Sequence, residues 1–297
     1  MKIIYKLLFL FLLTIGYSSC DFLDIVPDEI TTEADAFKDR NAAKNFVYSC
    51  YGYLPQSNVA SGSLDLLTGD EVITAFEHET FASFPKGNYT ASSPVISYWN
   101  TFFQGLRQCY IFLENVDKVP DLTESVKTDY IAQVKFLIAY YHYQLARCYG
   151  PIILIKELPD VNASQAEYLP RTSYDECVDW ICNLLDEAAS SLPAIRTNKE
   201  DYGLATSVGA KAVKAKMLLY AASPLFNGNS SFYSNFTDKS GSQLMPLTYD
   251  PNKWVKAKTA IKEAIDLAEQ NGHALYVKQD YKIGNEDANP YPAAGPV

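Results

Sequence analysis

The sequence has few of the residues from which catalytic and metal sites are usually built. Only three of its 297 residues are histidine, and none of the three has a partner at metal-ligand spacing. The six cysteines form no CxxC pair. The chain also contains no HExxH, P-loop, GxGxxG or nucleophile-elbow sequence. The sequence therefore predicts no metal site, no cofactor and no catalytic residues.

Clustered positive charge is also missing. The chain has 25 lysine and arginine residues against 35 aspartate and glutamate residues, a formal net charge of −10 at pH 7. Proteins bind the phosphates of nucleic acids through clustered lysine and arginine, and no basic stripe is present. We therefore expect no nucleic-acid partner. The 48% hydrophobic and 20% charged residues are typical of a folded globular protein.

The N-terminus carries an apolar run that is too short to span a bilayer. LLFLFLLTI, residues 7–15, follows two lysines and has the length of a secretory h-region. Two serines then precede Cys20, as at a lipoprotein cleavage site, although Tyr17 stands where an aliphatic residue is usual. We expect residues 1–19 to be a signal peptide and Cys20 to be acylated. The alternative is an ordinary secretory signal beside an incidental cysteine, which the absence of an A-x-A-like site disfavours.

The five remaining cysteines do not predict a disulfide framework, because their number is odd and their spacing irregular. We expect Cys50, Cys109 and Cys148 to be small buried hydrophobic residues, since each lies among aromatic and apolar residues of a predicted helix. Cys177 and Cys182 share one predicted helix, without the paired spacing of a zinc site. None of the five is expected to bind metal.

Apolar residues recur at the three- and four-residue spacing of a helix face through most of the chain. The pattern predicts helices within residues 97–116, 123–151, 173–193, 207–224 and 250–272. Ser173 and Glu176 have capping-box spacing, and Asp250 is expected to cap the last helix, with Pro251 in its first turn. Gly150 is expected to end the second helix. The predicted fold class is mainly α.

Two long polar segments separate the predicted helices, at residues 54–95 and 223–250. Irregular segments of this length in a compact domain are usually functional or mobile. A short strand is allowed at residues 152–155, which read IILI. Successive helices with small alanine contacts, one of them opening with Trp254, are typical of tetratricopeptide-type helix pairs. We therefore expect helix pairs joined by long irregular loops.

Five stretches of the sequence together resemble one family. They are DFLDIVP after Cys20, YWNTFFQGLRQCYIFLENVD, VKFLIAYYHYQLARCYGPIIL, GLATSVGAKAVKAKMLLYAASPLFNG and NKWVKAKTAIKEAIDLA. They occur in the family's order and cover most of residues 20–270. In these stretches the chain resembles the SusD/RagB outer-membrane nutrient-uptake lipoproteins of Bacteroidetes.

This resemblance implies a mainly α-helical fold in which tetratricopeptide-like helix pairs support a less regular ligand-binding part. It implies that residues 20–297 are the N-terminal portion of a SusD-like domain whose C-terminal part is missing here. It also implies a protein anchored by lipid on Cys20 to the outer membrane and facing the cell exterior. Such a protein captures an oligosaccharide or polysaccharide, or another nutrient polymer, and delivers it to a SusC-type TonB-dependent transporter. The acidic DFLD sequence after Cys20 resembles the export signal of these lipoproteins.

Aromatic and amide side chains suited to sugar binding gather just before and at the start of the first long predicted helix. Sugar rings stack on flat aromatic faces, while amide or charged groups bond their hydroxyls. Ligand sites in the resembling family draw on this same loop and helix start. The predicted ligand-binding residues are Phe81, Tyr89, Tyr98, Trp99 and Asn100.

Two other functions are compatible with the sequence. A surface glycoside hydrolase needs two carboxylates across the scissile bond, and GDEVITAFEHE, residues 69–79, offers acids beside His78. We favour ordinary surface acids at this place, because no catalytic motif accompanies them. A helical-repeat adaptor that binds other proteins would lack an aromatic stacking platform. We therefore expect a binding protein and not an enzyme.

Overall fold

A computed structural model describes residues 33–55, 69, 83–160, 162 and 169–275. Its α-helices are α2 (Glu33–Ala36), α3 (Arg40–Tyr51), α4 (Trp99–Asn115), α5 (Glu124–Tyr149), α6 (Tyr174–Ser191), α7 (Ser207–Ala222), α8 (Ser230–Tyr233) and α9 (Asn252–Gln270). Two 3-10 helices are η3 (Val116–Lys118) and η5 (Lys199–Asp201). Within these described residues no β-strand forms, and the one isolated bridge joins Thr237 to Gln243. The predicted mainly α fold is confirmed.

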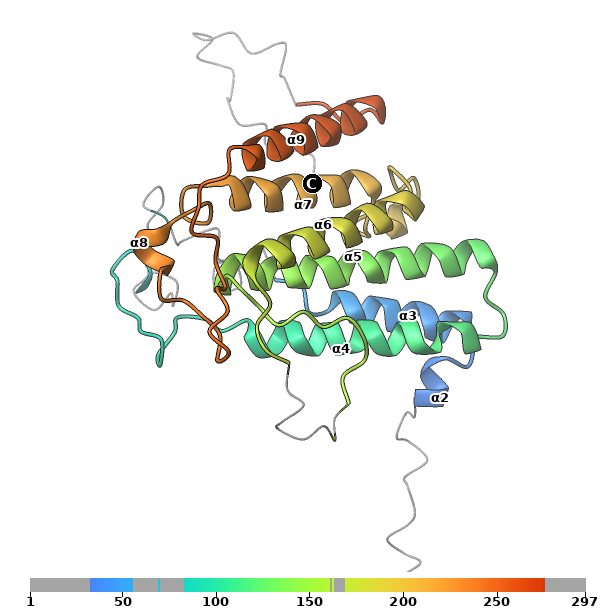
Figure 1. Cartoon of the computed structure of the whole chain (residues 1–297). Coiled ribbons are helices and arrows are strands. Elements are labelled where there is room, and N and C mark those ends of the chain that lie inside the picture. The colour runs from blue at the N-terminus through green and yellow to red at the C-terminus, as the bar shows by residue number, and fades with distance from the viewer. Residues whose placement is uncertain (1–32, 56–68, 70–82, 161, 163–168, 276–297) are drawn as a thin grey trace, which may run out of the picture.

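The long helices form three pairs, α3–α4, α5–α6 and α7–α9, that stack one on the next (Figure 1). The first helix of each later pair packs against both helices of the pair before it. Thus α5 contacts α3 and α4, and α7 contacts α5 and α6. Each pair therefore covers the open side of its predecessor, which is the tetratricopeptide-like arrangement that the sequence predicted.

Helix α5 lies in the middle of the stack and has neighbours on several sides. Leu137, Tyr141 and Leu145 follow its predicted apolar stripe and are fully buried. The Thr123 side chain accepts a hydrogen bond from the backbone N–H of Val126 and so caps the first turn. Gly150 ends the helix as predicted, with φ of 71°, a value that glycine adopts without strain.

A closed ring of hydrogen bonds ties α3 and α5 to the connection between α6 and α7. The Tyr51 hydroxyl donates to Gln133 Oε1 (3.0 Å), and Gln133 Nε2 donates to Asp129 Oδ2 (2.8 Å). Arg196 donates twice to the Asp129 carboxylate (2.8 and 2.9 Å) and twice to the Ala205 carbonyl (2.8 and 3.2 Å). The Ala205 N–H closes the ring on the Tyr51 hydroxyl (2.9 Å). Charge-assisted bonds thus join three segments that are distant in sequence.

The start of α6 differs from the prediction. Ser173 precedes the helix, but its side chain makes no capping hydrogen bond, so the predicted capping box is wrong. The N–H of Tyr174, the first residue of α6, is satisfied instead by the carbonyl of Leu244 at 2.9 Å. A tertiary contact has replaced the local cap. At α9 the predicted cap is displaced by one residue: Pro251 is the N-cap and has no side-chain capping bond. Asp250, just before it, accepts the N–H of Asn252 at its Oδ1 (2.9 Å).

Cys50, Cys109, Cys177 and Cys182 are free thiols, in agreement with the prediction that the cysteines do not form a disulfide framework. Cys50 and Cys109 are buried, as are Cys177 and Cys182, while Cys148 is half-buried. Burial raises the pKa of the Cys177 thiol to about 11 and that of Cys182 to about 12. These thiols are therefore poor nucleophiles and behave as small hydrophobic side chains.

The predicted signal peptide and Cys20 lie outside the described residues. Along the described ranges, no helix combines the length and the hydrophobicity that a membrane crossing requires. The lipid anchor stays a prediction.

His142 links α5 to the segment that follows it. Its buried ring donates from Nδ1 to the Ile138 carbonyl (2.8 Å) and accepts at Nε2 the N–H of Ile155 (3.1 Å). The second bond takes an N–H that a strand ladder would need, and residues 152–155 do not form the allowed strand. Burial lowers the pKa of His142 to about 4, and only the neutral ring satisfies both bonds.

We expect the protein to lose about 3 kcal/mol of stability as the pH falls from 6.5 to 4 because of His142. The unfolded chain takes up this proton near the ordinary pKa of 6.5, whereas the folded chain resists protonation down to about 4. The stabilisation from neutral, buried His142 is fully present above pH 6.5 and is lost as the pH falls toward 4. In urea denaturation, the gap in unfolding free energy between wild type and His142→Gln should narrow by this amount on acidification. A gap that stays constant would contradict the assignment.

Candidate ligand-binding site

Three long irregular segments lie at one end of the stack, which we name the loop end (Figure 1). Residues 83–98 lead into α4, residues 150–160 follow α5, and residues 223–251 connect α7 to α9. Because α5 and α7 end where α4, α6 and α9 begin, these segments meet at the same end. Binding residues are commonly carried by loops on a rigid scaffold, so the loop end is the first place to look for a ligand site.

Trp99, the first residue of α4, is the centre of an aromatic cluster at the loop end. Its ring meets Tyr149 edge-on at 5.2 Å and Phe103 at 5.0 Å between ring centroids. The guanidinium of Arg171 lies over the Trp99 ring, 5.3 Å from its centroid. Trp99 is half-buried, so part of the indole is open to solvent. An indole beside a guanidinium combines a stacking surface with hydrogen-bond donors, which is the chemistry that sugar binding requires.

Arg171 is held over Trp99 by the end of α5. Its Nη1 donates to the carbonyls of Tyr149 (3.2 Å) and Pro151 (2.7 Å). Gly150 turns the chain between these two carbonyls and lets both face the guanidinium. Within the described part of the chain, Nε and Nη2 of Arg171 make no hydrogen bond. They can donate to a bound ligand.

The two sequence neighbours of Trp99 differ in exposure. Tyr98 is buried, its ring stacks on Phe102 at 5.0 Å, and its backbone N–H donates to the Tyr149 hydroxyl at 2.9 Å. Tyr98 was predicted as a ligand contact, but its ring belongs to the core, where a sugar cannot stack on it. Asn100 is exposed on the first turn of α4. Its amide is open to a ligand at the loop end.

Tyr89 lies on the segment that leads into α4, and 50% of its surface is exposed. Its ring contacts Phe84 at 5.1 Å between centroids. The N–H groups of Gly87 and Asn88 bond carbonyls a few residues earlier, at 2.9 and 3.0 Å, and shape the turn that precedes it. Tyr89 therefore offers an exposed aromatic face, as predicted. Phe81 lies outside the described residues.

Sequence reasoning missed Tyr149 and Arg171. The predicted helix end at Gly150 could have indicated Tyr149. A helix that ends there and runs antiparallel to α4 places its last residue beside Trp99. No pattern in the sequence marks Arg171, which reaches the cluster from the segment just before α6. Its role depends on carbonyls that only the folded end of α5 presents.

Residues 223–250 form a closed excursion at the loop end. The buried side chain of Asn227 joins the two ends of this excursion, which form its base. Its amide donates to the Asp250 carbonyl and accepts the Asp250 N–H, both at 2.9 Å. Gly228 has φ of 77°, and a Cβ there would lie 2.3 Å from the backbone nitrogen of Tyr249. Only glycine fits this close approach. The excursion exposes Phe232 (75%) and Tyr249 (57%), two aromatic side chains that the sequence analysis did not select as ligand contacts.

The residues weighed for an enzyme do not form a site in the described part of the chain. The acids between residues 70 and 79, with His78, lie outside it. His142 is a core residue, and His273 is exposed just beyond α9. The described residues contain no group of three or more His, Cys, Asp or Glu that could hold a metal ion.

Comparison with known proteins gives consistent matches. Residues 21–219 match the profile of a SusD-like family described as starch-binding and associating with the outer membrane. SusD-like protein P25 of Formosa agariphila is 23% identical over 230 residues, which are 73% of this chain and 43% of P25.

Two solved structures are also similar. BT4246 is 36% identical with a TM-score of 0.72, over 79% of this chain and 41% of that one. A SusD-like protein of Bacteroides fragilis, BF3747, is 23% identical with a TM-score of 0.61, over 84% and 41% of the two chains. The chain spans less than half the length of each of these relatives.

We expect Gly228→Ala to cost at least about 2 kcal/mol more unfolding free energy than Gly241→Ala. Both glycines have positive φ, but a Cβ at Gly241 meets nothing within 4 Å, whereas one at Gly228 collides with backbone. Comparing the two variants therefore separates the steric clash of the new Cβ from the cost of placing alanine at positive φ. Urea denaturation followed by circular dichroism measures both variants. Equal losses would show that the base of the excursion is not closed as described.

Proposed function

Because the chain belongs to the SusD-like family of starch-binding proteins that associate with the outer membrane, we propose that it binds a carbohydrate polymer or its fragments at the cell surface. The family match over residues 21–219 carries this proposal. The aromatic cluster at the loop end supports it independently, since it pairs a partly open indole with guanidinium donors that make no hydrogen bond to the described residues.

The proposed ligand contacts are the exposed or half-exposed members of the predicted set, together with Arg171, which only the structure reveals. Tyr89 and Trp99 supply aromatic faces, and Asn100 and Arg171 supply donors for sugar hydroxyls. Phe81 stays a predicted contact on the same approach to α4. Tyr98 acts indirectly, by packing beneath the cluster.

We further propose that the protein binds its carbohydrate without cleaving it. The matching family is described by binding and not by a reaction. Hydrolysis of a glycosidic bond needs two carboxylates across a sugar. Among the described residues, the ring and guanidinium contacts of Trp99 are made by Phe103, Tyr149 and Arg171. Such side chains can hold a sugar but supply neither the acid nor the base.

The proposed setting is the outer face of the outer membrane, with the protein anchored through acylated Cys20. The family description of outer-membrane association supports this setting, as does the order of basic, apolar and Ser-Ser-Cys residues at the N-terminus. A protein held by lipid alone cannot move a ligand inward. We therefore propose delivery to a SusC-type TonB-dependent transporter.

We expect the soluble protein, starting near residue 21, to bind a member of a broad glycan panel in calorimetry without releasing reducing ends. Tyr89→Ala should weaken that binding by ~1 kcal/mol, about fivefold, because one stacking face is lost. Tyr202→Ala is the matched control, since Tyr202 is 64% exposed but lies between α6 and α7, away from the loop end. Equal weakening by both variants would contradict the site. Binding to no glycan, or released reducing ends, would contradict the function.

We expect cells supplied with a labelled fatty acid to label the wild-type chain and Cys148→Ala, but not Cys20→Ala. Cys20 is the proposed acylation site, whereas Cys148 is a half-buried residue of α5. Wild type purified from outer membranes in mild detergent should also bring down a β-barrel transporter. Equal labelling of all three chains would count against the anchor, and recovery of the labelled protein alone would count against a stable complex.

A further inference from the structure

Arg171, just before α6, carries a positive charge that no carboxylate in the described part of the chain neutralises. The residue is exposed, and its Nη1 donates to the carbonyls of Tyr149 and Pro151. Tyr149 is the last residue of α5, so the guanidinium lies at the negative end of that helix, where a cation is favourable without a carboxylate partner. The charge of Arg171 therefore stays available beside Trp99.

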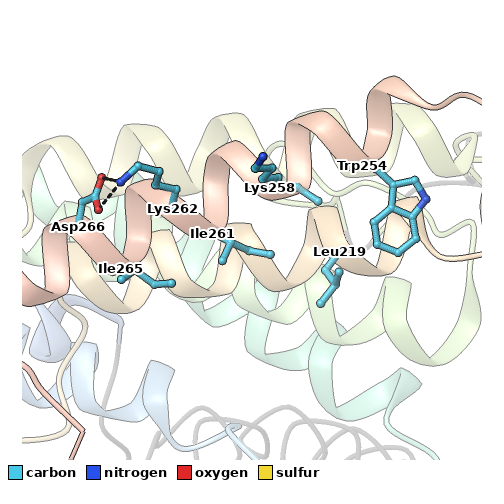
Figure 2. Close-up of a pocket in the computed structure, with 8 residues that line it drawn as sticks. Leu219, Trp254, Lys258, Ile261, Lys262, Ile265 and Asp266 are labelled. Carbon is cyan, nitrogen blue, oxygen red and sulfur yellow. Dashed lines mark hydrogen bonds and ion pairs between the residues drawn. The ribbon is translucent and has the colours of Figure 1, made fainter.

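Other cations of the described chain do have carboxylate partners. Arg196 donates twice to Asp129, and Lys262 on α9 bonds both oxygens of Asp266, at 2.8 and 2.7 Å. Figure 2 shows the second pair at the border of an apolar groove that α9 and the end of α7 line. Acidic residues outnumber basic ones by 35 to 25 in this chain. Against that excess, an exposed arginine without a carboxylate partner at a candidate ligand site points to an anionic ligand.

The acidic residues of the loop end are engaged elsewhere or carry no ion pair. Six of them lie in its described segments and in the first turn of α6: Glu157, Asp160, Asp175, Glu176, Asp238 and Asp250. Asp175 pairs with Lys253 at 2.5 Å, and the three other aspartates accept backbone N–H groups of their own turns. The two glutamates are exposed and form no ion pair with the described residues. None of the six takes the charge of Arg171.

The bonds that hold Arg171 leave one edge of its guanidinium open. Its Nη1 is taken by the two carbonyls, whereas Nε and Nη2 bond none of the residues that the structure describes. These two nitrogens lie side by side and donate in parallel, which matches the paired oxygens of a carboxylate or a sulfate. A neutral hydroxyl accepts such a bond without any charge pairing. The open edge therefore suits an anionic group better than a hydroxyl.

We propose, resting on the carbohydrate binding put forward above, that the ligand is an acidic saccharide whose negative group binds Arg171. The carboxylate or sulfate accepts from Nε and Nη2, while the sugar ring packs on the exposed part of Trp99 and its hydroxyls bond the Asn100 amide. Uronic-acid and sulfated saccharides present the same paired oxygens. Arg171 thus determines specificity between acidic and neutral glycans.

The test compares acidic glycans with neutral forms of the same backbone, by calorimetry on the full chain in mild detergent. The probes are oligogalacturonate and oligoalginate with their carboxyl-reduced forms, carrageenan and fucan oligosaccharides with their desulfated forms, and neutral maltooligosaccharides. In at least one pair, the wild type should bind the acidic member about tenfold more tightly. The pair that shows this preference identifies the anion as a carboxylate or a sulfate. Arg171→Gln should abolish the preference, and Arg171→Lys should retain little of it, because one ammonium does not match two oxygens.

Lys199→Gln is the matched control, because exposed Lys199 in η5 carries the same charge away from the loop end. The readout is a ratio of two affinities, which a smaller folded fraction of a variant does not change. Neutral glycans that bind as tightly as their acidic forms would overturn the acidic preference and leave carbohydrate binding intact. A preference that survives Arg171→Gln, or that Lys199→Gln reduces equally, would place the anion elsewhere. Binding to no glycan of the panel would contradict the proposed function itself.

Discussion

The burial of α5 among α3, α4, α6 and α7 is the constraint on which the rest of the structure depends. Its buried polar side chains, Gln133, His142 and Gln144, cannot reach water, so each needs a partner inside the protein. Gln133 bonds Tyr51 and Asp129, and Gln144 bonds the Tyr140 hydroxyl at 2.7 Å. The Tyr51–Gln133 bond therefore fixes α3 against α5 by a polar contact as well as by apolar packing, which specifies the register of this pair more narrowly than packing alone.

Helix positions and several helix ends could be predicted because their causes are local. The three- and four-residue spacing of apolar side chains marks each buried face, and Gly150 marks an end through its backbone conformation. The start of α6 could not be predicted in detail. The group that satisfies its first N–H is the Leu244 carbonyl, 70 positions beyond Tyr174, and a local cap was redundant once that contact formed.

The candidate site also combines residues that could be predicted from the sequence with features that depend on tertiary packing. Trp99 and Tyr89 were identifiable because aromatic residues at a loop and a helix start are visible in the sequence. The sequence did not show that Tyr98 is buried while Trp99, the next residue and of similar chemistry, is partly exposed. Tyr98 is buried because Phe102 and the Tyr149 hydroxyl lie on its side of the chain, while Trp99 stays open beside Arg171. Which of two neighbouring rings meets solvent depends on the packing of α4 against α5 and not on either residue alone.

The hydrogen-bonded ring of Tyr51, Gln133, Asp129, Arg196 and Ala205 has an evolutionary consequence. Its four side chains each serve two partners, so replacing one of them strands donors or acceptors on both sides in a largely buried place. Loss of Asp129, for example, leaves the guanidinium of Arg196 without its counterion and the Gln133 amide without its acceptor. Single replacements are costly, whereas a concerted exchange for apolar residues of matching shape costs little. We therefore expect these four positions to change together among related sequences, because each side chain constrains replacement of the other three.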